Sequence, residues 1–222
     1  VSDLAVPEGI VNLHSQAFYS CTNITTVSIP ATLQSGVEGL AHCPNLADIA
    51  LADGNPYYRM HDGILTDAAA RTVYFCSRGK MGNVVLPDTA TRIYQYAFSG
   101  CIGITAVSFP DGVTSINGHA FQNCTNLENA TLPDGLVSIL IGAFRNCGKL
   151  SSIKLPSTAV NINNQAFLGC GGLRNVTLNQ YACTNTLQTL FRDAYQSITN
   201  VVIADGVTTI GASAFYSCSG LT

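Results

Sequence analysis

The sequence has few charged residues: Asp, Glu, Lys and Arg make up 10% of its 222 residues, whereas 47% are hydrophobic. Its 10 Lys and Arg are scattered and are outnumbered by 13 Asp and Glu, so the basic stripe that binds nucleic-acid phosphates is missing. The sequence also lacks any apolar run near the roughly 20 residues that a membrane-spanning helix requires. We therefore expect a substantial core, no nucleic-acid partner and no membrane span.

Catalytic and metal-binding motifs are missing as well. There is no Gly-x-Ser-x-Gly, phosphate loop, His-Glu-x-x-His or calcium-loop pattern, and no Cys-x-x-Cys pair typical of zinc sites. His119 with Cys124 could form a base and a nucleophile, but the same Cys recurs in other units without that His and indicates core. Asp62-Gly63 beside His61 is typical of a turn. We expect no enzyme activity, no cofactor and no metal.

What the sequence does contain is a repeat of 23 residues, which determines the architecture. Related units open and close the chain, so it is almost all repeat. Three markers keep this spacing: Pro87, Pro110, Pro133 and Pro156; the Ala-Phe pairs that begin at residues 97, 120, 143 and 166; and Cys101, Cys124, Cys147 and Cys170.

The sequence of each unit predicts one short strand and one short helical segment, which we call the arc. Hydrophobicity alternates through Leu150, Ile153 and Leu155, which predicts a strand that ends at the following Pro. The stretch from Gly118 to Cys124 has room for about two turns of α or 3-10 helix. We expect an α/β repeat solenoid of parallel strands and helical arcs in which stacked copies share one core. Its inward positions are those of Val113, Ile116, Phe121, Cys124, Leu127 and Leu132.

The unit carries a resemblance to a known family. Pro-Asp-Gly-Val-Thr-Ser-Ile at 110–116, followed by Ala-Phe-x-x-Cys-x-x-Leu at 120–127, resembles the BspA-like leucine-rich repeats of bacterial surface proteins. The interruption at 52–86 is similar to a hairpin insertion of that family. The resemblance covers nearly the whole chain and implies a right-handed leucine-rich repeat coil, an extracellular or cell-surface location, and adhesion to host proteins.

We expect a single solenoid over residues 1–222, with the hairpin-containing insertion at 52–86 within it. The unit at 30–51 has Gly39-Leu40 in place of Ala-Phe, and the unit that starts near Asn179 has no Cys at the expected place. The chain starts in mid-unit and stops where a new strand should begin. We interpret it as a fragment of a longer protein.

The nine cysteines are interpreted mainly as buried thiols. Seven lie in register, and stacked repeats about 5 Å apart with parallel Cα–Cβ vectors suit a disulfide poorly, because its Cβ atoms lie about 3.8 Å apart. Cys76 and Cys183 lie outside this register. Cys76 is either a small apolar residue of the hairpin or a reactive thiol.

Two surfaces are candidates for ligand binding. On each strand, the neighbours of the inward residue point away from the core and are mostly small and polar; the alternative is a solvated face with no ligand. The aromatic residues of the insertion could anchor an interface or only cover the break in the solenoid. The strand-face candidates are Thr26, Ser28, Asp48, Ser108, Asn129, Thr131, Ser152, Lys154, Asn175 and Thr177, and the second patch is Tyr57, Tyr58, Tyr74 and Phe75.

The function expected from these features is a non-enzymatic, cell-surface or secreted binding or adhesion module that recognises a protein or glycan through the strand face. A structural spacer that displays another module is the alternative. An enzyme of unrecognised type is the remote one.

Overall fold

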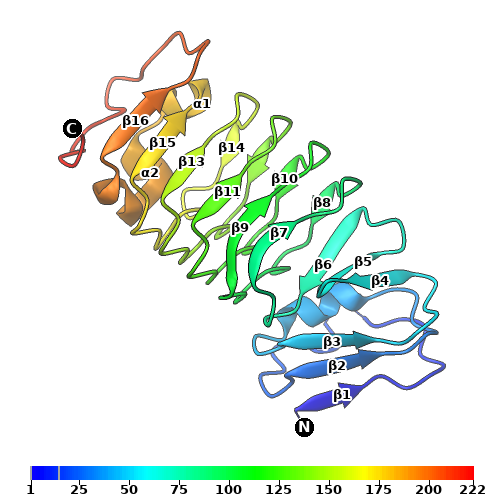
Figure 1. The fold of residues 1–222 in the computed structure, drawn as a ribbon. Coiled ribbons are helices and arrows are strands. Elements are labelled where there is room, and N and C mark those ends of the chain that lie inside the picture. Colours follow the sequence, from blue (N-terminus) through cyan, green and yellow to red (C-terminus); the bar gives the residue numbers. More distant parts are fainter. Residues whose placement is uncertain (1, 15) are drawn as a thin grey trace.

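The computed structural model describes residues 2–14 and 16–222 as a stack of short coils (Figure 1). Val1, where the expected domain starts, lies outside the described residues. The strands are β1 (Asp3–Ala5), β2 (Thr26–Ile29), β3 (Asp48–Leu51), β4 (Tyr58–His61), β5 (Ile64–Asp67), β6 (Thr72–Cys76), β7 (Gly82–Val85), β8 (Arg92–Ile93), β9 (Ile104–Ser108), β10 (Ser115–Ile116), β11 (Asn129–Thr131), β12 (Ser138–Ile139), β13 (Ser152–Lys154), β14 (Asn161–Ile162), β15 (Asn175–Leu178) and β16 (Asn200–Ile203). The helices are η1 (Val37–His42), α1 (Gln180–Thr184), α2 (Leu187–Phe191) and η2 (Arg192–Ser197), of which η1 and η2 are 3-10 helices.

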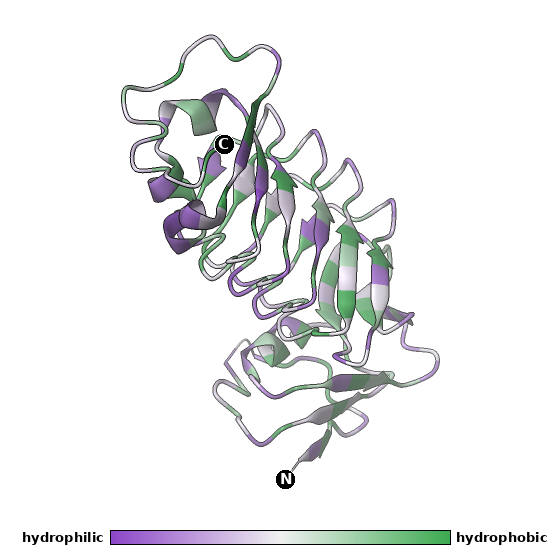
Figure 2. Ribbon diagram, turned by 60° about the vertical axis from the view of Figure 1, so that its left-hand side comes forward, coloured by the Kyte–Doolittle hydropathy of each residue, from purple (hydrophilic) through white to green (hydrophobic). Residues whose placement is uncertain are grey.

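The strands form three sheets, in the orders β1-β2-β3, β16-β15-β13-β11-β9-β7 and β14-β12-β10-β8-β6-β5-β4. Neighbouring coils pair in parallel with a shift of one repeat, as Ser152 with Asn175. Most strands show both hydrophilic and hydrophobic bands in Figure 2, as expected for strands with one buried face. The repeat solenoid with few short helices is thereby confirmed.

Each central coil contains a second strand that the sequence analysis did not predict. β10, β12 and β14 are two-residue strands in which Ile116, Ile139 and Ile162 point into the core. The expectation of one strand per repeat was therefore wrong. Two residues are too few for an alternating pattern to be recognised.

The expected helical arc from Gly118 to Cys124 is also different: it is a series of turns. His119 and Asn123 have φ angles of 58° and 61°. The N–H groups of Phe121 and Asn123 donate to the next coil, to the carbonyls of Ala143 and Arg145, both at 2.8 Å. These N–H groups are thus unavailable for i→i−4 bonds, and no α-helix forms. The described helices lie instead in the two units that depart from the repeat, at 37–42 and 180–197.

A stack of phenylalanine rings lies at the centre of the core. Phe98, Phe121, Phe144 and Phe167 are all 0% exposed, and successive ring centroids are 4.7, 5.5 and 5.6 Å apart with nearly parallel planes. The other predicted core positions of this unit are buried, except that Leu132 is only half-buried and packs against the core from its edge.

The buried thiols connect successive coils. Cys124, Cys147 and Cys170 donate from Sγ to the carbonyls of Phe98, Phe121 and Phe144, at 3.1, 3.2 and 3.0 Å. Each thiol therefore satisfies a buried carbonyl of the coil before it. All nine cysteines are free thiols.

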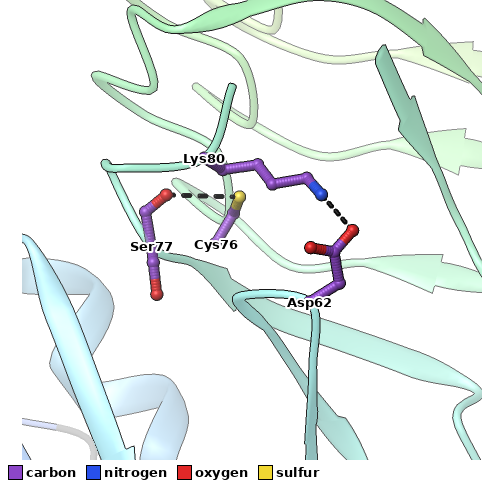
Figure 3. A network of polar contacts seen from close by, with 4 residues as sticks. All are labelled: Asp62, Cys76, Ser77 and Lys80. Carbon is purple, nitrogen blue, oxygen red and sulfur yellow. Dashed lines mark hydrogen bonds and ion pairs between the residues drawn. The ribbon is translucent and has the colours of Figure 1, made fainter. Parts of the chain in front are cut away.

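Cys76 ends the phenylalanine stack. Its N–H donates to Ala97 at 2.7 Å, as Phe98 donates to Ala120 one coil later, and its carbonyl accepts from the Cys101 thiol at 3.5 Å. Its side chain is 1% exposed and lies 3.6 Å from the Ser77 carbonyl (Figure 3). The hydrogen bond with the Cys101 thiol, and then burial, raise the pKa of the Cys76 thiol well above its ordinary value. These contacts favour the small apolar role over the reactive one.

The interruption of the repeat begins with a hairpin. β4 and β5 pair antiparallel and are joined by Asp62-Gly63, whose φ angles of 51° and 75° are those of a type I′ turn. Lys80 forms an ion pair with Asp62 and ties this turn to the following segment (Figure 3). β6 then pairs in parallel with β8 and returns the chain to the solenoid.

β5 separates two hydrophobic cores. Ile64 belongs to the core of the central and C-terminal coils, and the next residue, Leu65, belongs to the core of the N-terminal coils. Because successive side chains of a strand point to opposite faces, β5 forms a wall between them. The strands β1–β3 run in a different direction from β7–β16 (Figure 1).

The hairpin insertion and the helical segment at 180–197 each begin after a buried Asn, Asn55 or Asn179. The Asn55 amide donates to the carbonyls of Pro30 and Leu33, at 2.8 and 3.2 Å. The Asn179 amide donates to the carbonyl of Pro156 at 2.6 Å and to a second carbonyl, at Ala159. These amides fasten the start of each irregular segment to the regular coil before it.

We expect Phe121→Ala to lower the free energy of unfolding by about 3 to 5 kcal/mol, because it leaves a cavity between two stacked rings. Urea titration would measure the change. Lys149→Ala, at an exposed position in the following repeat, should stay within about 0.5 kcal/mol of the parent protein. A loss below 1 kcal/mol for Phe121→Ala would contradict the role given to the stack.

Only Cys21 and Cys218, which are half-buried, should react with a thiol-specific reagent such as DTNB in the folded protein. Burial raises the pKa of the Cys43 thiol to about 11, and the charge of Cys21 adds to this, so Cys43 should be slow at neutral pH. A Cys21→Ser/Cys218→Ser variant should be almost silent until denaturant is added. Fast labelling of Cys76 in that variant would contradict the burial of the Cys76 thiol.

Candidate functional site

The six-stranded sheet presents two columns of outward side chains. In β7 to β15 of this sheet a buried residue, such as Val107, Ile153 or Val176, lies between two outward ones, and in β16 the half-buried Val201 takes this place. The register aligns equivalent positions of adjacent strands. Adjacent strands lie about 4.8 Å apart, which sets the spacing of each column. The first column is Asn83, Ala106, Asn129, Ser152, Asn175 and Asn200, and the second is Val85, Ser108, Thr131, Lys154, Thr177 and Val202.

The columns are mainly amides and hydroxyls, with Lys154 as their one charged member. Asn200 donates its amide to Asn175 Oδ1 at 3.3 Å, so two members of the first column already interact. Val85 and Val202, near the two ends of the second column, are 69% and 49% exposed. The middle of the sheet is therefore the most polar part of this face.

A hollow of about 430 Å³ lies over β11 and β13. Four predicted residues line it, namely Asn129, Thr131, Ser152 and Lys154. Asp111 and Asp134, from the turns after the repeat prolines, line it too. Lys154 forms no ion pair within the part of the chain that the structure describes, so charges of both signs border the hollow without neutralising each other.

Seven of the ten predicted strand-face residues lie on this sheet, and three do not. Thr26, Ser28 and Asp48 belong to the separate sheet β1-β2-β3. The Thr26 hydroxyl donates to the Asp3 carboxylate, and Asp48 accepts from the Ser77 hydroxyl. The insertion therefore divides the predicted strand face in two.

The four aromatic residues of the insertion do not form one exposed patch. Tyr57 is 40% exposed and Tyr58 only 4%. The ring of Tyr74 lies 5.9 Å from that of Tyr58 and 5.8 Å from that of Tyr94. Burial raises the pKa of both Tyr58 and Tyr74. Tyr58, Tyr74 and Phe75 contribute to the N-terminal core, which agrees with rings that cover the break.

The side chains of His119 and Cys124, considered as a base and a nucleophile, each contact another group. The Cys124 thiol is held by the Phe98 carbonyl, and burial raises its pKa well above the ordinary value. The His119 ring stacks on Tyr96 with a centroid distance of 5.0 Å. In residues 2–14 and 16–222 no group of three His, Cys, Asp or Glu side chains is placed to hold a metal, and no helix there has the length and apolarity to span a membrane.

The sequence analysis missed a second hollow, of about 330 Å³, at the break in the repeat. We call it the break pocket; Tyr19, His42, Phe75, Arg78, Tyr96 and Ser99 are among the residues that line it. Tyr19 and Ser99 occupy the same position of their units, directly after an Ala-Phe pair, but the insertion lies between the two units. Phe75 and Arg78 belong to the insertion, which lies outside the repeat, so periodicity could not have placed them beside the other lining residues.

Comparisons with known structures agree with this fold. A leucine-rich cell surface protein of Faecalibacterium prausnitzii matches 100% of this chain and 63% of its own, with a TM-score of 0.76 at 20% sequence identity. The pneumococcal vaccine antigen PcpA matches 94% of this chain and 59% of its own, with a TM-score of 0.75 at 16% identity. A leucine-rich repeat protein of Eubacterium ventriosum matches 100% and 77%, with a TM-score of 0.63 at 18% identity.

The chain thus spans less than two thirds of the first two proteins, and at these identities the likeness shows the fold. No curated protein matches the chain. A family model for the BspA type leucine-rich repeat region matches it in six copies, over residues 1–59 and 71–193. The chain belongs to the BspA-type leucine-rich repeat family.

Proposed function

We propose that the chain is a non-enzymatic binding module, displayed at a cell surface or secreted, that holds a protein or glycan ligand on its six-stranded sheet. The observation that carries this proposal is the pair of outward columns in register, centred on the hollow over β11 and β13. Two proteins of similar fold, a leucine-rich cell surface protein and a pneumococcal vaccine antigen, support the location.

The columns have properties that suit an extended polar ligand. Asn, Ser and Thr offer both donors and acceptors, and their short side chains lose little conformational entropy when a ligand fixes them. Their repeat of about 4.8 Å presents the same groups at regular intervals. A ligand with hydroxyls or peptide groups along its length can bond to several coils at once.

The charged rim of the hollow supplies the specificity. Asp111 and Asp134 lie on one side of it and Lys154 on the sheet. Groups of both signs at the rim select a ligand by charge pattern more than they add to its affinity. A neutral or mixed-charge ligand fits this rim better than a strongly acidic or basic one.

Binding to an array of extracellular-matrix proteins and glycans tests the proposal. Ser152→Arg/Asn175→Arg places two long cations in the first column and should weaken binding at least about tenfold, since two or more hydrogen bonds and close contact are lost. Ser138→Arg/Asn161→Arg is the matched control: it has the same spacing and residue types, but lies on the seven-stranded sheet. This control should bind like the parent protein.

Two outcomes would contradict the proposal. If no ligand binds, the structural spacer displaying another module becomes the better interpretation. If both double variants bind equally well, the ligand site lies away from the six-stranded sheet.

A further inference from the structure

The break pocket exists because one coil is shortened. Val73 pairs with Ile93, and Val84 with Val107, but 11 residues separate Val73 from Val84 whereas 14 separate Ile93 from Val107. Most of the missing residues belong to the start of the arc, because Cys76, which takes the place of Phe98, lies three residues after Val73, whereas Phe98 lies five residues after Ile93. The shortened arc leaves a hollow beside Tyr96 and Ser99.

The edge of the next arc keeps the hydrogen bond from Cys76 to Ala97 but lacks the two regular bonds on either side of it. In the following coil, the carbonyls of Gly118 and Gln122 accept from the N–H groups of Tyr96 and Gly100, at 3.2 and 2.8 Å. The equivalent carbonyls are those of Gln95 and Ser99. Within the described residues no backbone N–H donates to either of them.

Aromatic rings from both sides of the break line the pocket. The His42 ring lies 5.2 Å from that of Tyr19 and 6.0 Å from that of Tyr96, and its Nε2 lies 3.3 Å from the Gln95 amide nitrogen. Phe75 lines the pocket from the insertion. The pocket therefore offers flat apolar rings to a ligand.

Arg78 is the one permanent charge in this pocket. Its Nη2 donates to the Pro44 carbonyl, while its Nε is buried and has no partner within the described chain. Burial lowers the pKa of the Arg78 guanidinium, because the charged form loses solvation there. No Asp or Glu lines the pocket, so the cation lacks the carboxylate that a half-buried Arg ordinarily has.

Half of the remaining lining residues carry hydroxyls or amides, namely Ser20, Thr22, Ser99, Gln122 and Asn123. The other half are Leu40, Ala41, Cys43, Pro44 and Leu46. Asn123 accepts from the Asn146 amide at 2.9 Å. The volume of about 330 Å³ is at the small end for ligand pockets. It suits a compact ligand with many hydroxyls better than a length of peptide.

We infer that the break pocket binds an acidic sugar unit, whose carboxylate lies against the Arg78 guanidinium and whose ring lies against Tyr96 and His42. Arginine pairs with carboxylates through charge-assisted hydrogen bonds. The sugar hydroxyls bond to the side chains of Ser99 and Gln122. This site is separate from the six-stranded sheet and does not depend on the function proposed for it.

Titration of the 222-residue chain with methyl β-D-glucuronide, followed by NMR, tests the inference. The signals of Tyr96 and His42 should shift, and methyl β-D-glucoside, which lacks the carboxylate, should bind at least about tenfold more weakly. Arg78→Gln should bring the glucuronide down to the level of the glucoside. Thermal unfolding of the variant shows whether its fold is kept.

Ser99→Phe tests the site without altering Arg78, because it fills the pocket from the rim. Its matched control is Leu168→Phe, at the same position of a coil three repeats further on and outside the pocket. Ser99→Phe should abolish the shifts, and Leu168→Phe should leave them unchanged.

Three results would overturn the inference. The first is that the glucuronide produces no shifts at Tyr96 and His42. The second is that it binds folded Arg78→Gln as well as the parent protein. The third is that an acetylated, amidated glutamyl peptide binds in the pocket while the glucuronide does not, which would assign the pocket to acidic peptides instead. Loss of sugar binding in the Ser152→Arg/Asn175→Arg variant is not expected, so the two proposals can fail separately.

Discussion

Each regular coil after the break is held to the next by backbone hydrogen bonds that require the same register at several places around the turn. The bonds lie in the two sheets and in the arc, where Phe121 donates to Ala143 and Asn123 to Arg145. A coil of different length can keep the hydrogen bonds at one of these places only by losing those at another. The 23-residue period, the close stacking of the Phe rings and the thiol bonds between coils all follow from this common register.

The pattern of hydrophobic residues and the spacing of the repeated Pro, Ala-Phe and Cys residues were enough to predict the repeat, the main strand of each coil and most of the core. Each of these features recurs along the chain. The arcs were mispredicted, since their N–H groups bond to a neighbouring coil and no local pattern records that. The two-residue strands were missed for the same reason: Ser115–Ile116 is a strand only because Ser138–Ile139 lies beside it.

The middle of the strand face was predictable from the sequence, and its N-terminal end was not. Residues such as Asn129, Ser152 and Asn175 follow from alternation along each strand. The separation of Thr26 and Asp48 from them depends on how the insertion returns to the solenoid. The break pocket lay beyond prediction, because Tyr19, Arg78 and Tyr96 meet only where the repeat fails.

The wall formed by β5 divides the molecule mechanically. In repeat proteins each coil is coupled to its nearest neighbours, so a disturbance in one coil of a continuous phenylalanine stack would pass to the next coil. Here the stack ends at Cys76, and Ile64 and Leu65 give the two sides separate cores. If the chain is pulled from its ends, the three N-terminal strands can come apart while the C-terminal stack stays folded. A chain built in this way yields in steps, and its six-stranded sheet survives the first of them.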